Sequence, residues 1–196
     1  MRSSHAVAPV TSLSSRPVPV RTGGALLEYE PSAAPLRVAG FGGATSVSGE
    51  PSDQGGLYAG ALVAYEGGWI GLGAGPVLIP GDEPRNHLVP SLYLRFGDRE
   101  RGFFQADVFA PSPFPGATGL GRIGVGFRGD RTSGLFGFSG GRALDLDDSG
   151  DNWGPFGELK FPVSGNLDAL IAASWFPGEE HSDWGAGIGL RYRPKE

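Results

Sequence analysis

Side chains suited to acid–base or nucleophilic chemistry are sparse in this chain. Its three histidines are His5, His87 and His181, and it contains no cysteine. His87 and Ser91 lie on one face of a predicted strand, but four residues at about 3.3 Å each place them about 13 Å apart, too far for proton transfer. The lack of cysteine excludes disulfides and thiolate metal sites. We therefore predict that the protein is not an enzyme.

One segment, residues 145–151, has the spacing of a metal-binding loop. Its oxygen-bearing side chains at alternate positions are Asp145, Asp147, Ser149 and Asp151. With Gly150 at the turn, this arrangement matches the first half of an EF-hand calcium loop. The bidentate acid that completes such a loop is missing, because Phe156 occupies its place. The sequence thus predicts an acidic turn, with weak Ca²⁺ binding as the alternative and no other cofactor.

The chain between and around these segments contains β-strands, recognisable because apolar residues alternate with glycine or charged residues at every second position. Between Gly119 and Arg128, bulky apolar residues such as Ile123 and Val125 alternate with Arg122 and with glycines. Only a β-strand presents such a pattern on two faces. The same alternation predicts ten strands, at 36–45, 56–65, 68–78, 88–96, 101–110, 119–128, 132–143, 154–162, 166–176 and 184–193.

The connections between these strands alternate in length. Short turns at 66–67, 97–100, 129–131 and 163–165 alternate with longer connections at 46–55, 79–87, 111–118, 144–153 and 177–183. Antiparallel neighbours joined in this way place all short turns at one end of a sheet and all long loops at the other. The predicted fold is all-β, an up-and-down antiparallel β-barrel of about ten strands, with eight as the alternative count.

The domain organisation follows from composition. Residues 1–35 contain five prolines and several serines without sustained alternation, which is typical of an extended tail or linker. We therefore predict a Pro/Ser-rich disordered tail at 1–35 and a single β-barrel domain at 36–196.

The polar face of the strands indicates which way the barrel faces. A solvated face normally carries lysine, glutamate and threonine, yet the chain has only two lysines, and its polar strand positions hold glycine, arginine and scattered acids. Opposite charges inside a narrow lumen can pair, so we place this face inside. The predicted lumen network consists of Arg95, Gln105, Asp107, Arg122, Arg128, Glu158, Lys160, Asp168, Arg191 and Arg193.

Aromatic residues gather near both ends of the predicted strands. Towards the long loops lie Trp153, Phe156, Trp175, Phe176 and Trp184; towards the short turns lie Phe96, Phe103, Phe104, Phe127, Phe161 and Tyr192. Two such girdles are typical of barrels that span a membrane. Because no apolar run reaches the length of about 20 residues that a spanning helix needs, strands would have to cross the bilayer.

In these features, residues 36–193 resemble the small outer-membrane β-barrel proteins of Gram-negative bacteria. The resemblance implies location in the bacterial outer membrane, contact with lipid, and a structural or narrow-pore, porin-like role. Residues 1–15 contain no apolar leader, and the chain ends Arg193-Pro194-Lys195-Glu196 where such barrels end on an aromatic residue, with Tyr192 as the nearest candidate.

Two alternatives follow from the same residues. One is a soluble β-barrel that binds an apolar small molecule in its core, which requires the apolar face to point inward. The other is a self-assembling structural β protein, a homo-oligomer joined through strand edges. The long connections carry eleven acids against one arginine, which argues against nucleic acid as a partner.

Overall fold

A single antiparallel sheet accounts for the whole described fold. The computed structural model describes residues 2–6, 13–14, 20–30, 34–47, 55–79, 87–109, 121–140, 153–177 and 183–192. Within these ranges every regular element is a β-strand, and all strands belong to one sheet. The same ranges contain no helix long and apolar enough to cross a membrane.

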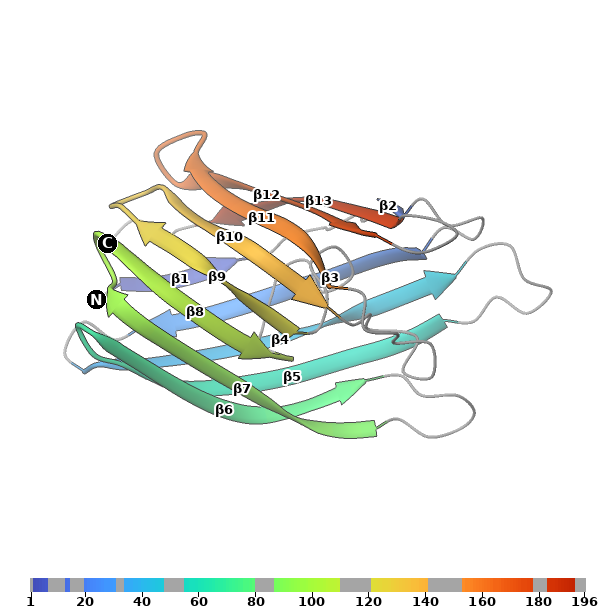
Figure 1. The fold of residues 1–196 in the computed structure, drawn as a ribbon, viewed down its shortest axis with the longest axis horizontal. Helices are drawn as coiled ribbons and strands as arrows, with labels where there is room; N and C mark the ends of the chain where they lie inside the picture. The colour runs from blue at the N-terminus through green and yellow to red at the C-terminus, as the bar shows by residue number, and fades with distance from the viewer. Residues whose placement is uncertain are drawn as a thin grey trace.

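Eleven long strands follow one another up and down, each hydrogen-bonded to the next (Figure 1). They are β3 (Val20–Glu30), β4 (Leu36–Val47), β5 (Gly55–Glu66), β6 (Ile70–Ile79), β7 (His87–Asp98), β8 (Gly102–Val108), β9 (Gly121–Arg128), β10 (Ser133–Gly140), β11 (Trp153–Pro162), β12 (Leu167–Phe176) and β13 (Asp183–Tyr192). The predicted fold class is confirmed, and each end of the ten predicted strands lies within three residues of an end of β4–β13.

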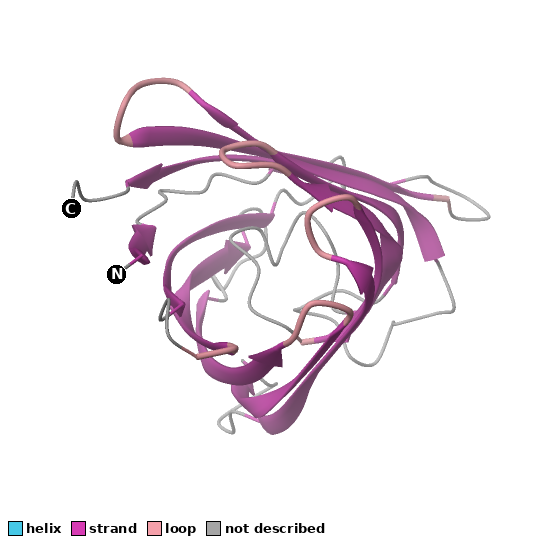
Figure 2. Cartoon of the chain, turned by 90° about the vertical axis from the view of Figure 1, so that its left-hand side faces the viewer, coloured by secondary structure: helices cyan, strands magenta, loops and turns pink. Residues whose placement is uncertain are grey.

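Two short N-terminal strands lie between the edges of this sheet. β1 (Arg2–Ala6) pairs with β3 from Arg2↔Glu30 to Ala6↔Leu26 and meets β13 at His5↔Tyr192. β2 (Leu13–Ser14) pairs with β13 at Ala186 and Gly185. Figure 2, an end-on view, shows the sheet curling round on itself. Both edge strands are therefore partly hydrogen-bonded, since β1 pairs with five residues of β3 and β1 and β2 together pair with three of the ten residues of β13.

The structure corrects the predicted tail. Residues 20–30 form β3, which pairs with β4 along ten positions, so the expected disorder of 1–35 is wrong for this stretch. The alternation was present, since Leu27 and Tyr29 face outward while Leu26 is buried. Nearby Pro19 and Pro31 suggested a linker instead. Pairing with β4 overrides that local composition, and the count of long strands rises from ten to eleven.

The two faces of the sheet differ as the alternation predicts. Large apolar side chains point outward, among them Val125 and Ile188 with 62% and 61% of their surface exposed. Charged side chains point inward, and Arg95 and Asp168 are 1% and 0% exposed. This is the reverse of a soluble barrel, whose apolar side chains fill the interior.

Three of the predicted girdle aromatics face the interior instead. Trp153, Trp175 and Trp184 point outward, but Phe156 and Phe176 are only 5% and 6% exposed. Phe103 lines an interior cavity, whereas its neighbour Phe104 is 40% exposed. Successive side chains of a strand point to opposite faces, so adjacent aromatics cannot both belong to an outer girdle.

Paired glycines allow two neighbouring strands to come unusually close. Gly124 of β9 and Gly137 of β10 are directly opposite each other. A Cβ atom added at Gly137 would lie 2.0 Å from the carbonyl oxygen of Ile123. No side chain fits at that distance, so glycine is required at this position of β10.

Candidate functional site

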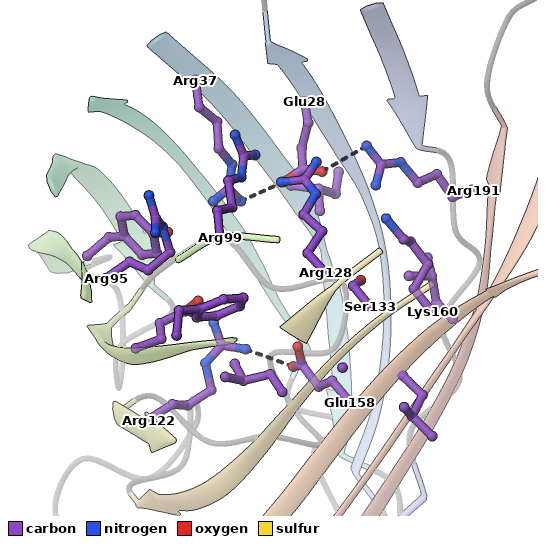
Figure 3. A pocket seen from close by; sticks show the side chains of 18 of the residues that line it. Glu28, Arg37, Arg95, Arg99, Arg122, Arg128, Ser133, Glu158, Lys160 and Arg191 are labelled. Atoms are coloured by element: carbon purple, nitrogen blue, oxygen red, sulfur yellow. Dashed lines mark hydrogen bonds and ion pairs between the residues drawn. The ribbon is translucent and has the colours of Figure 1, made fainter. Parts of the chain in front are cut away.

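The interior holds a cavity at one end of the barrel. We call that end the turn rim, because the short turns at 67–69, 99–101, 129–132 and 163–166 lie there; the opposite end is the loop rim. The cavity measures about 190 Å³ (Figure 3). Its charged lining comprises Arg37, Arg95, Arg99, Arg122, Arg128, Lys160 and Arg191 together with Glu28, Glu30, Glu66 and Glu158. Seven strands and the turn between β7 and β8 contribute these side chains.

Two glutamates of β3 hold four arginines of the cavity wall. The contacts are Arg37–Glu28 at 2.5 Å, Arg191–Glu28 at 3.4 Å, Arg99–Glu30 at 2.7 Å and Arg128–Glu30 at 3.2 Å. Glu28 and Glu30 occupy alternate positions of one strand, so both point inward. These contacts connect β3 with β4 and β13 near by and with β9 on the far side of the barrel.

A second ion pair joins the end of β5 to β7. Arg95 donates from Nε to Glu66 at 3.2 Å, from Nη1 to the carbonyl of Gly97 at 2.7 Å and from Nη2 to the carbonyl of Gly67 at 2.5 Å. Arg37 approaches the same glutamate at 3.6 Å. Because a buried charge is tolerable only when it is well paired, these bonds explain how Arg95 remains enclosed.

Arg122 forms the pair deepest in the barrel. Its Nε donates to Asp107 at 2.7 Å and its Nη1 to Glu158 at 2.7 Å. Asp107 is directly opposite Arg122 on β8, but Glu158 lies two strands away on β11. The side chain passes Gly124 and Gly137, which have no side chains to obstruct it. Gln105 supports Asp107 with an Nε2 donor at 2.6 Å.

Two further cations, Arg131 and Lys160, lie closer to the turn rim than Arg122 does. Arg131 contacts Asp168 at 3.1 Å and also donates to the carbonyl of Ser164. Lys160 lines the cavity and forms no ion pair within 4.0 Å with any acid of the described part of the chain. It is thus the lumen cation that lacks a direct carboxylate contact among the described residues.

The structure brings together nine of the ten predicted lumen residues. Seven of them line the cavity, and Asp107 and Asp168 contact arginines beside it. Arg193 lies outside the described residues. So do the predicted calcium ligands Asp145, Asp147, Ser149 and Asp151, whose role stays a prediction. In the described ranges no group of three His, Cys, Asp or Glu side chains is placed to hold a metal.

Sequence reasoning missed six charged residues of this network. They are Glu28, Glu30, Arg37, Glu66, Arg99 and Arg131. The first two lie in β3, which was assigned to the tail, and Glu66, Arg99 and Arg131 lie in or beside turns. Arg37 could have been found, since it stands between the outward positions Leu36 and Val38 of a predicted strand.

Comparison with known proteins identifies no family. No protein-family model matches the chain, and no curated protein is similar to it in sequence. Among solved structures, outer membrane phospholipase A from Escherichia coli is 9% identical, with a TM-score of 0.48 over 97% of this chain and 90% of that one. The Salmonella typhi outer membrane phospholipase dimer with bound calcium is 8% identical, with a TM-score of 0.47 and coverage of 97% and 90%. Likeness at this level carries no inference about activity, and the barrel assignment rests on this chain's own strand pairing.

Proposed function

We propose that this chain is a barrel of the bacterial outer membrane with a structural or narrow-pore role and no catalytic activity. The observation that carries the proposal is the orientation of the wall, with apolar side chains outside and ion pairs inside. Soluble monomers rarely expose contiguous apolar patches larger than a few hundred Å². Lipid is the environment that favours this surface, and we take it as the principal partner.

The dimensions of the outer surface suit a bilayer. Strands of 12 residues such as β5 extend about 40 Å at 3.3 Å per residue and cross about 28 Å if tilted by about 45°. Aromatic residues that face outward near the two ends include Trp153, Trp175 and Trp184 at the loop rim and Phe96 and Tyr192 at the turn rim. An apolar band of this height between aromatic girdles is the pattern of membrane barrels.

A narrow pore fits the interior better than a wide channel does. Leu26, Ala39, Leu62, Ala64 and Tyr93 form a packed cluster inside the wall. The remaining cavity of about 190 Å³ has room for several water molecules or a small ion. The alternative of an apolar ligand in the core loses support, because charged side chains line this cavity. Self-assembly through strand edges has less support, because β1 and β2 already pair with part of each edge strand.

A charge placed on the outer wall tests the membrane assignment. Val125 is 62% exposed in the middle of β9, and Val163 is 59% exposed in a turn. Under the proposal, Val125→Arg lowers the free energy of unfolding in lipid vesicles by about 2–4 kcal/mol, because it places a cation in the apolar bilayer. Urea titration of the folded protein, followed by heat-modifiable gel migration, measures this loss.

Val163→Arg is the matched control, since its side chain lies at the turn rim near water. A soluble barrel tolerates arginine at both exposed sites. Equal stability of the two variants, with the native protein recovered in the soluble fraction after a carbonate wash of the membranes, would reject the membrane assignment.

A further inference from the structure

The charges that line the turn-rim cavity do not cancel. Seven arginine or lysine side chains face four glutamates, a formal excess of three positive charges. Asp107, which contacts Arg122 from outside the lining, reduces the excess to two. A recess lined by uncompensated charge of one sign attracts counterions, because its low-dielectric walls focus the electric field. The cavity is therefore suited to an anion.

The excess is concentrated on one part of the wall. Arg128 of β9 is directly opposite Ser133 of β10, which is directly opposite Lys160 of β11. Side chains paired in this way have Cβ atoms about 5 Å apart, so a hydroxyl lies between two cations. The row continues through Leu170 and Gly189, so among its five residues there is no acid.

Arg191 adds a third cation beside this row. It lies on β13, at the next inward-facing position after Gly189. Figure 3 shows Arg128, Lys160 and Arg191 extending towards the same region of the cavity. The two arginines share their glutamates with Arg99 and Arg37, which make the shorter contacts, at 2.7 and 2.5 Å. Lys160 has three donors and, as described above, no direct carboxylate contact.

From this juxtaposition we propose that Arg128, Lys160 and Arg191, with the hydroxyl of Ser133, bind a free oxyanion of the phosphate class. Three cations on different strands converge on one volume, which suits a compact, multivalent anion with oxygens in several directions. A doubly charged anion would also balance the remaining excess. Binding of this anion is independent of the membrane, whereas its passage through the barrel rests on the proposed narrow-pore function.

Direct titration of the folded protein in detergent micelles tests the site. Inorganic phosphate is added at constant ionic strength against sodium chloride, and binding is measured by isothermal calorimetry. The expected result is saturable binding that Lys160→Gln weakens about tenfold, because one charge-assisted hydrogen bond is lost. Arg101→Gln is the matched control, since Arg101 contacts Asp98 at 3.6 Å in a turn and does not line the cavity.

A second variant distinguishes a loss of phosphate binding from a loss of folding. Lys160→Glu places an acid two strands from Arg128, which should pair with it, keep the barrel folded and abolish phosphate binding. Heat-modifiable migration verifies that each variant is folded. No saturable binding to the native protein, or equal affinity of native and Lys160→Gln proteins, would overturn the proposal.

Single-channel recording separates this inference from the proposed pore. Phosphate binding in micelles without conductance in planar bilayers supports the anion site and rejects the pore. Conductance without saturable phosphate binding rejects the anion site and leaves the pore in place.

Discussion

The inner wall near the turn rim and the inner wall near the loop rim are built from different side chains. At the turn rim, residues such as Glu28, Arg37 and Arg95 form a network of ion pairs. At the loop rim, the buried positions include Tyr58, Val77, Ser139, Phe156 and Phe176, with Ser91 nearer the middle of its strand. Arg122, which contacts Asp107 and Glu158, lies at the boundary between the two halves.

The difference shows two ways of filling one narrow barrel. In the turn-rim half, paired charges fix side chains from distant strands, because an enclosed charge without a partner is costly. Among the described residues of the loop-rim half, aromatic and small side chains fill the space by packing. Within the part of the chain that the structure describes, the charged side chains that line the cavity therefore belong to the turn-rim half.

Replacement of Arg122, at the boundary between the two halves, should cause the largest loss in the free energy of unfolding. Arg122→Met leaves Asp107 and Glu158 without this cation in a buried setting, for which we expect a loss of about 3–5 kcal/mol in the free energy of unfolding. Urea titration in vesicles measures the loss. Arg122→Lys should give an intermediate value, because a single ammonium group does not replace the two-sided contact. A change as small as that of the exposed Arg101→Met would contradict this view of the boundary.

Gly137→Ala should cause the next largest loss in the free energy of unfolding. The added Cβ would approach the carbonyl of Ile123, so β9 and β10 must separate, at a cost of about 1–3 kcal/mol. The same titration measures this cost. Gly165→Ala is the control, since a Cβ there has no heavy atom within 4 Å. Similar stability of the two variants would show that close strand approach is not required.

The smallest loss in the free energy of unfolding is expected from a substitution that changes only side-chain shape in the loop-rim half. Phe156→Leu keeps the position apolar and should cost less than about 1.5 kcal/mol, while phosphate affinity in the turn-rim half stays the same. Phe138→Leu on the outer wall should cost still less, because this side chain is already 56% exposed. Calorimetry with phosphate provides the readout, and an altered affinity in Phe156→Leu would mean that the two halves are coupled.

Much of the fold could be predicted from local alternation. The period of two along 119–128 places Arg122 and Val125 on opposite faces without any knowledge of the neighbouring strands. β3 was missed because prolines beside it carried a stronger local signal than its alternation. Nearness to a strand end predicts an outer girdle position for Phe103, Phe156 and Phe176, but their place in the alternation puts them on the inner face.

The sequence by itself determined where ten strands lie, which residues share a face and that the charged face is suited to a narrow interior. These are local properties, since alternation is visible within a single strand. Only the tertiary structure decided which charges meet. Arg128 contacts Glu30 across 98 residues, and Arg122 reaches Glu158 past Gly124 of its own strand and Gly137 of the intervening strand. Such contacts depend on strand register and on the curvature of the closed sheet, which bring together side chains that no sequence spacing relates.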